Sequence, residues 1–259
     1  MNPPVALTIA GTDSGGAAGT AADLATFAAL GVHGACVITA VTAQDTTGVS
    51  DIHAVPIATV ATQLHAVFDD LPVAAVKTGM LGSAEAVALV SRLCADRPLV
   101  VDPVLVATSG AVLGGEDVRR AYLDHLLPVA TVVTPNLDEA RALAGHDGSP
   151  EEIAAELASA KSAVIVTGGD PEATGTCTDW LAEPGRPPIP LTHPAVPTKN
   201  DHGTGCTYSS ALAAHLAHGA PLHEAAEQAA AYVTRQLTRS QHWTLGRGRG
   251  PIAHTKETA

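Results

Sequence analysis

The sequence predicts an α/β fold in three layers, with helices on both faces of a central, mainly parallel sheet. Short apolar runs alternate with longer, alanine-rich stretches of helical character along most of the 259 residues. Continuous apolar runs are typical of strands that are covered on both faces. Strands that alternate with helices form parallel sheets, because each helix carries the chain back to the start of the next strand. The hydrophobic fraction of 46% is that of a chain that folds around a core.

The elements can be assigned in chain order. Apolar runs predict strands over 5–9, 35–39, 74–77, 99–101, 131–133 and 164–166. Helical patterns lie between them and after them, over 18–30, 57–70, 83–94, 115–127, 137–144, 150–160, 204–218 and 222–239. The last two helices are separated by Gly219 and Pro221. The proline-rich segment 183–197 is expected to form a loop or an edge strand, since hydrophobic patterning resumes soon after it. We therefore expect a single domain over residues 1–259.

Composition narrows the range of functions. The net charge is −12 with only 14 Lys and Arg residues, and aromatic residues make up 3% of the chain. Binding to nucleic acid is therefore not expected. No run approaches the ~18 apolar residues of a membrane span, and the N-terminus does not resemble a signal peptide. The four cysteines form no CxxC pair, which favours reduced thiols in a cytoplasmic protein.

The most informative motif is GTGC at 203–206, where a helix is expected to begin. The N–H groups of a helix N-terminus favour negative charge, and glycine lets an anion approach the backbone. The same position lowers the pKa of a cysteine, so we expect Cys206 to be partly a thiolate. An anion cradle beside a base suits phosphoryl transfer to an alcohol, and His202 can help to neutralise charge. On the motif alone, an ordinary glycine-rich loop with a buried cysteine is an equal alternative.

Further polar residues follow predicted strands, where ligands bind in open α/β sheets. The glycine-rich segment 11–19 lacks the lysine of a P-loop. Asp23, in the next helix, can accept hydrogen bonds from a substrate or simply complement the helix dipole. Gln44 lies in a predicted polar loop, and its amide suits a heterocycle with a ring nitrogen beside an amino group. Met80 can line an apolar pocket or belong to the core.

Candidate ligands for a cation and for phosphates follow the later strands. Asp102 ends a strand and can bind Mg²⁺ directly or through water. Asn136 and Glu139 are three residues apart at the start of a helix, so both can face one site, although they also have the spacing of a capping box. Thr167 and Gly169 follow the strand at 164–166 and can let nucleotide phosphates approach the backbone, or form an ordinary turn.

In this order, these clusters resemble the hydroxymethylpyrimidine/phosphomethylpyrimidine kinases of thiamine biosynthesis, which belong to the ribokinase-like superfamily. The resemblance covers essentially the whole chain. Its most specific stretches are ADL at 22–24, TAVTAQ at 39–44, GMLGS at 79–83, DPV at 102–104, TPN at 134–136 and HGTGCT at 202–207. It implies a ribokinase-like fold and a kinase that uses ATP and Mg²⁺. The implied substrates are 4-amino-5-hydroxymethyl-2-methylpyrimidine and its monophosphate, and such enzymes are often homodimers.

The resemblance also implies a role for each candidate residue. Asp23 and Gln44 would hold the aminopyrimidine, with Gly11, Ala18 and Met80 around the ring. Gly203 and Gly205 would bind the transferring phosphoryl group, and Cys206 would replace the aspartate base of sugar kinases. The phosphates of ATP would contact Asn136, Glu139, Thr167, Gly169 and Thr204. Asp102 and Glu139 would bind Mg²⁺, directly or through water.

Two alternatives stay open. Pyridoxal also carries a hydroxymethyl group on a heteroaromatic ring, so a pyridoxal-type kinase of the same superfamily is the first, and Gln44 and Cys206 favour the pyrimidine over it. The second is a catalytically silent pyrimidine-binding regulator, against which the intact GTGC motif argues. Asp201 stands where the family commonly has threonine, and Thr167 where lysine is frequent. Both differences bear on the second phosphorylation, whose substrate is anionic.

Overall fold

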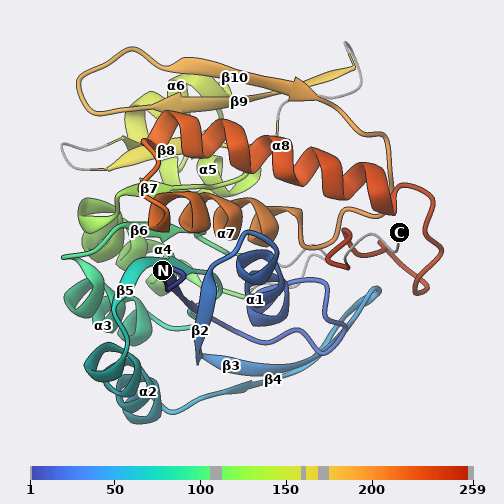
Figure 1. The fold of residues 1–259 in the computed structure, drawn as a ribbon. Coiled ribbons are helices and arrows are strands. Elements are labelled where there is room, and N and C mark those ends of the chain that lie inside the picture. Colours follow the sequence, from blue (N-terminus) through green and yellow to red (C-terminus); the bar gives the residue numbers. More distant parts are fainter. Residues whose placement is uncertain (1, 106–112, 159–161, 169–174, 256–259) are drawn as a thin grey trace.

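The computed structural model describes residues 2–105, 113–158, 162–168 and 175–255, built around an eight-stranded sheet (Figure 1). The strand order is β10-β9-β8-β7-β6-β5-β1-β2. Six strands are parallel: β1 (Val5–Ala10), β2 (His33–Ile38), β5 (Val73–Thr78), β6 (Leu99–Val101), β7 (Val132–Val133) and β8 (Ala163–Val166). Antiparallel β9 (Thr176–Ala182) and β10 (Ile189–Pro194) complete one side of the sheet. The predicted α/β class with a mainly parallel sheet is confirmed.

Helices cover both faces of this sheet. One layer contains α2 (Ile57–Asp70), α3 (Ala84–Cys94), α4 (Glu116–Ala121), α5 (Leu137–Ala144) and α6 (Pro150–Leu157). The other contains α1 (Gly19–Ala29), α7 (Thr204–Ala217) and α8 (Leu222–Ser240). Successive side chains of a strand point to opposite faces, so in β6 Leu99 and Val101 pack on the first layer and Val100 on the second. This double burial explains the continuous apolar runs in the sequence.

The predicted polar loop around Gln44 is instead a β-hairpin, and this part of the prediction is wrong. Strands β3 (Ala40–Asp45) and β4 (Gly48–Ala54) pair with each other in a separate two-stranded sheet. Most residues of β4 are exposed, so neither strand needs the apolar run by which the others were identified. Gln44 therefore lies on a strand, which fixes its backbone more firmly than a loop would.

Two other segments differ from prediction. The helix expected over 115–127 is α-helical only for Glu116–Ala121 and continues as a π-helical turn, Tyr122–Leu126, and a 3₁₀ turn, Leu127–Val129. Pro128 lies in that last turn, and proline disrupts the α-helical hydrogen-bond pattern. Strand β9 was not predicted, whereas β10 is the edge strand expected within 183–197.

The topology places the polar clusters at one edge of the sheet. After β1 the chain continues to its neighbour β2. After β5, the neighbour of β1 on the other side, it continues to β6, still further from β2. The loops after β1 and β5 therefore run in opposite directions. Such a switch point in an open α/β sheet leaves a crevice at the carboxyl ends of the strands. In the part of the chain that the structure describes, no helix has the length and apolarity to cross a membrane.

Candidate active site

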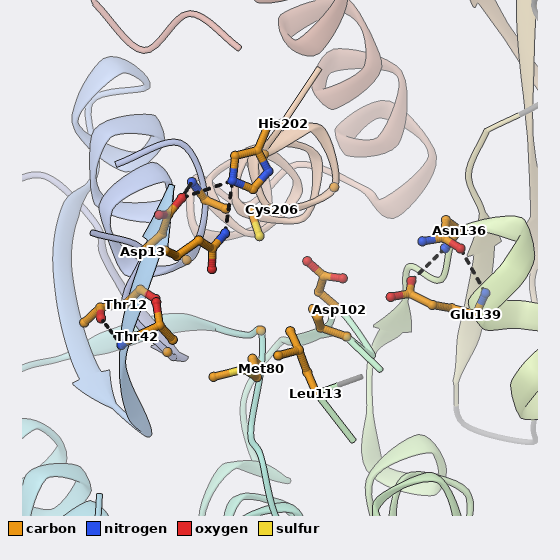
Figure 2. A pocket seen from close by; sticks show the side chains of 18 of the residues that line it. Thr12, Asp13, Thr42, Met80, Asp102, Leu113, Asn136, Glu139, His202 and Cys206 are labelled. Atoms are coloured by element: carbon orange, nitrogen blue, oxygen red, sulfur yellow. Dashed lines mark hydrogen bonds and ion pairs between the residues drawn. The ribbon is translucent and has the colours of Figure 1, made fainter. Parts of the chain in front are cut away.

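A pocket of about 150 Å³ lies at the carboxyl ends of the parallel strands (Figure 2). The structure brings most of the predicted site residues into its wall: Gly11, Ala18, Gln44, Met80, Asp102, Asn136, Glu139, Thr167, Gly203, Gly205 and Cys206. Thr204 instead faces a neighbouring groove. Gly169 lies outside the described residues, and Asp23 does not line the pocket. Residues predicted from separate clusters thus meet in one place.

The first loop of the pocket is organised by Asp13, which sequence reasoning missed. Its carboxylate accepts hydrogen bonds from the backbone N–H groups of Gly15 at 2.8 Å, Ala17 at 3.1 Å and Ala18 at 2.9 Å. Burial raises the pKa of Asp13, but the hydrogen bonds from His202 and from the loop outweigh it, and the pKa is lowered overall. Asp13 is therefore an ionised anchor that folds the loop.

The same loop touches the start of α7, and glycine is required there. Gly203 has a φ of +90°, and a Cβ on it would lie 1.8 Å from the carbonyl oxygen of Ala17. The backbone conformation and the close approach both exclude a side chain. Beyond this glycine the N–H of Thr204 bonds to Asp201, while those of Gly205 and Cys206 have no partner among the described residues. These two N–H groups are available to an anion.

The prediction that Asp23 contacts the substrate is wrong. Its side chain is completely buried in α1, where it accepts hydrogen bonds from Thr8 and Ser210 and pairs with Lys77 at 2.9 Å. Its accepting capacity is used within the protein. Lys77 is itself completely buried, and its Nζ also lies 3.9 Å from Asp102. Burial lowers the pKa of Lys77, but the nearby carboxylates, Asp23 foremost and then Asp102, raise it overall, so Lys77 stays charged.

The pKa of Cys206 is raised, not lowered as the motif predicted. The thiol and the carboxylate of Asp102 point toward each other in the pocket (Figure 2). Burial is the largest cause of the shift, Lys77 opposes it, and Asp102 and Asp23 add to it, so the pKa reaches about 12. The helix N-terminus does not compensate for burial and two carboxylates. Cys206 is a neutral thiol at physiological pH.

This raised pKa predicts slow alkylation of Cys206. With a pKa of about 12, only about one thiol in ten thousand is ionised at pH 8, because each pH unit changes the ratio tenfold. Iodoacetamide should therefore modify Cys206 at least about a hundred times more slowly than a free cysteine peptide. Peptide mass spectrometry over time measures this. Urea-unfolded protein is the control, in which all four cysteines should react quickly; rapid modification in the folded protein would contradict the shift.

Asn136 and Glu139 form the capping box that was the alternative interpretation, and they line the pocket as well. The N–H of Glu139 donates to the side chain of Asn136 at 2.9 Å, and the N–H of Asn136 donates to Glu139 at 3.1 Å. Burial, and then the charge of Asp102, raise the pKa of Glu139 to about 8. Burial likewise raises the pKa of Asp102. Two buried carboxylates thus face one part of the pocket (Figure 2).

These carboxylates can hold a divalent cation. Hard oxygen ligands suit Mg²⁺, which usually takes one or two carboxylates together with waters and phosphate oxygens. In the described ranges no group of three or more His, Cys, Asp or Glu side chains could hold a metal ion by itself. Asp102 and Glu139 therefore fit a cation that is shared with a phosphate ligand, and not a cage made of protein alone.

A larger groove of about 1390 Å³ adjoins the pocket, and Asn136, Thr167 and Gly205 belong to both. The negative charge of Asp201, at the rim of the groove, is paired: its carboxylate accepts from Arg249 Nε at 2.7 Å, and the same arginine makes a second, shorter contact. Asp201 therefore adds less negative charge to the anion site than the sequence suggests. The small pocket and the larger groove thus both border the N-terminus of α7.

Comparisons with known proteins agree with this geometry. A family model described as phosphomethylpyrimidine kinase matches residues 13–253. A hydroxymethylpyrimidine/phosphomethylpyrimidine kinase from Rhizobium meliloti is 46% identical over 259 residues, covering 96% of both chains. The crystal structure of an ADP complex of Bacillus subtilis pyridoxal kinase has a TM-score of 0.86 and 32% identity, and covers 97% of both chains. The phosphomethylpyrimidine kinase of Clostridium difficile has a TM-score of 0.75 and 33% identity, covering 90% of this chain and 98% of that one.

Proposed function

The chain belongs to the phosphomethylpyrimidine kinase family, and we propose that it transfers the γ-phosphoryl group of ATP to the hydroxymethyl group of 4-amino-5-hydroxymethyl-2-methylpyrimidine. In a second round it phosphorylates the monophosphate to the diphosphate, as a step of thiamine biosynthesis. The observation that carries the proposal is the adjoining pocket and groove. Asn136, Thr167 and Gly205 border both, so an alcohol in the pocket meets a nucleotide phosphate from the groove.

The pocket residues suit the two halves of this reaction. Gln44 offers an amide to the aminopyrimidine, and Gly11, Ala18 and Met80 surround the ring. The free N–H groups of Gly205 and Cys206 stabilise the negative charge on the transferring group, as donors aimed at a developing anion do. Phosphoryl transfer passes through a loose transition state that asks little of a base. A neutral Cys206 can therefore act by hydrogen bonding to the substrate hydroxyl.

A phosphate that enters the pocket comes close to the carboxyl groups of Asp102 and Glu139, and a cation is required for these groups to be ionised beside it. We propose that these two residues hold Mg²⁺, directly or through water. Held there, Mg²⁺ would supply positive charge that offsets the negative charge of the ATP phosphates. Thr167 borders both the pocket and the groove, and its hydroxyl, held among the described residues only by a 3.4 Å contact with the carbonyl of Pro135, can turn to donate to a phosphate. Thr204 lies in the wall of the groove, but its hydroxyl donates to the carbonyl oxygen of Asp201 at 2.6 Å, so only its position and not a free donor supports phosphate binding there.

The raised pKa of Glu139 predicts a stability that depends on pH. A carboxyl whose pKa is about 8 in the folded state and about 4.3 when unfolded binds a proton more tightly in the folded state. The free energy of unfolding therefore falls as the pH rises from about 4 to about 8. Glu139→Gln keeps the capping geometry and removes this titration, so its unfolding free energy should fall less over the same range.

Urea unfolding at pH 5.5, 7 and 8.5 measures the effect. Glu85→Gln is the matched control, because Glu85 lies in the first turn of α3, is exposed, and does not face the pocket. An identical pH slope for Glu139→Gln and wild type would contradict the assignment. In the presence of ATP and Mg²⁺, Glu139→Gln should also raise the Mg²⁺ concentration required for half-maximal turnover.

Mass spectrometry of products formed from ATP tests the function. The pyrimidine, its monophosphate and pyridoxal are offered separately. Formation of the pyrimidine mono- and diphosphate supports the proposal, and monophosphate alone limits it to the first step. A better rate with pyridoxal would favour the second candidate, a pyridoxal kinase, to which the high TM-score of the Bacillus subtilis enzyme points. No transfer to any acceptor would favour a silent binding protein.

Assembly and location are further proposals that rest on the family. We propose a single ribokinase-like domain over residues 1–259 that works as a cytoplasmic homodimer. The four cysteines are free, as they would be in a reducing compartment. Sedimentation equilibrium measures the oligomeric state, and a monomer at micromolar concentration would contradict the dimer.

A further inference from the structure

Three side chains from distant parts of the sequence meet beside the substrate pocket. Asp13 comes from the loop after β1, Gln44 from β3 and His202 from the segment before α7. His202 Nε2 lies 3.2 Å from Asp13 Oδ2, and the amide nitrogen of Gln44 lies 3.1 Å from the same ring nitrogen (Figure 2). Asp13 and His202 are both buried. Asp13 has no part in the chemistry described above, and His202 was expected only to help neutralise charge.

Asp13 determines where the proton of the imidazole lies. Its carboxylate accepts three backbone hydrogen bonds and has a lowered pKa, so it is ionised and can only accept. The ring nitrogen that faces it must therefore carry a hydrogen. The other ring nitrogen, Nδ1, is buried and has no hydrogen-bond partner among the described residues. An unpartnered lone pair on Nδ1 costs less free energy than an unpartnered N–H would. The contact of Nε2 with Asp13 and the lack of a partner at Nδ1 therefore both favour the proton on Nε2.

This proton position conflicts with an amide nitrogen beside Nε2, since two N–H donors cannot bond to each other. A half-turn of the terminal amide exchanges its oxygen and nitrogen without changing its shape. The backbone of Gln44 is held independently, because its N–H and its carbonyl both bond to the hydroxyl of Ser14 at 2.8 and 2.7 Å. Only the amide orientation remains to be decided, and His202 decides it.

We propose that Asp13 and His202 are positioning residues. The Nε2–H of His202, shared between the carboxylate of Asp13 and the Gln44 amide, turns the amide oxygen toward itself and the amide N–H groups toward the substrate. In this orientation the Gln44 side chain offers only hydrogen-bond donors to the substrate. The site selects a heterocycle that presents a hydrogen-bond acceptor, such as a ring nitrogen, at this point. An exocyclic amino group must find its acceptor elsewhere. The identity of the substrate in this inference rests on the proposed function. The orientation of the Gln44 amide does not depend on that function.

A double-mutant cycle on the full-length enzyme tests the coupling. His202→Leu removes the donor and frees the amide to turn, so KM for the pyrimidine should rise about tenfold, the loss of roughly one hydrogen bond. KM for ATP and kcat should each change by less than about threefold. His202→Gln retains an N–H donor and should recover most of the loss. In a Gln44→Ala background, His202→Leu should have almost no further effect on KM, since residues that act through one another are not additive.

Additive effects of the two substitutions, or a fall in kcat with an unchanged KM, would overturn the proposal. The exposed His146→Leu serves as a control that should leave all constants unchanged. An analogue in which the ring nitrogen facing Gln44 is replaced by C–H should bind wild type and Gln44→Ala about equally. Equal discrimination against this analogue by both enzymes would also contradict the assigned donor.

The tautomer can be measured without any substrate. Nitrogen-15 correlation spectra of the histidine rings at pH 7, with His202→Gln to identify the signal, should show the proton of His202 on Nε2. A proton on Nδ1 alone would overturn the inference even if the enzyme phosphorylates the pyrimidine. Conversely, failure of wild type to phosphorylate the pyrimidine would contradict the proposed function and leave the tautomer result intact.

Discussion

Replacing Lys77 with methionine should lower the free energy of unfolding by about 3–5 kcal/mol, because it leaves buried carboxylates without a counter-ion. The ammonium group lies 2.9 Å from both oxygens of Asp23 and 3.9 Å from Asp102, and the side chains of Lys77 and Asp23 are completely buried. For a chain of this length, a loss of this size lowers the melting temperature by about 10 °C. Thermal and urea unfolding at pH 7.5 measure it.

Two comparisons isolate the buried charge as the cause. Arg120→Met breaks an exposed pair with Glu116 at 2.9 Å and should cost less than about 1 kcal/mol. In Lys77→Met, acidification to pH 5 should reduce the deficit, because burial already raises the pKa of Asp102 and protonation removes the unpaired charge. An unchanged melting temperature in Lys77→Met, or a deficit that grows on acidification, would contradict this account.

Replacing Cys206 with alanine should reduce kcat by about 10²–10³-fold, the effect of removing one group that contacts the reacting atoms. KM for ATP should change little, because the thiol faces the pocket and not the larger groove, whose wall includes Thr204 and Gly205. Cys206→Ser should retain more activity than alanine, since its hydroxyl can still hydrogen bond. Steady-state kinetics with the pyrimidine and ATP varied separately provide both constants.

The pH profile distinguishes a thiol from a thiolate in this role. With a pKa of about 12, Cys206 does not titrate between pH 6 and 9, so Cys206→Ser should keep the shape of the wild-type profile. Cys36→Ala is the control, since Cys36 lies on β2 and does not line the pocket. Near-normal turnover by Cys206→Ala would exclude a catalytic role. A limb of the wild-type profile near pH 8 that the serine variant lacks would indicate a thiolate instead.

The hydrophobic pattern predicted the elements that the core covers. Val100 and its neighbours are buried on both sides of β6, so their apolar run was sufficient to locate the strand. The hairpin of β3 and β4 was missed because exposed strands do not require such a run. The π-helical turn at Tyr122–Leu126 was missed because its residues keep the amphipathic pattern of an α-helix, with Tyr122 and Leu126 buried, and only its backbone hydrogen bonds differ.

Some features of the functional site likewise follow from the local sequence, and others depend on tertiary contacts. By itself the sequence determined the mainly parallel α/β fold, the meeting of the polar clusters at the strand ends and the start of α7 at the GTGC motif, because these follow from periodicity and chain direction. Only the tertiary structure decided the protonation of Cys206, the withdrawal of Asp23 from the pocket and the contact of Asp13 with His202. Electrostatic shifts depend on burial and on charges brought close in space, and Lys77 reaches Asp23 across 54 residues of chain.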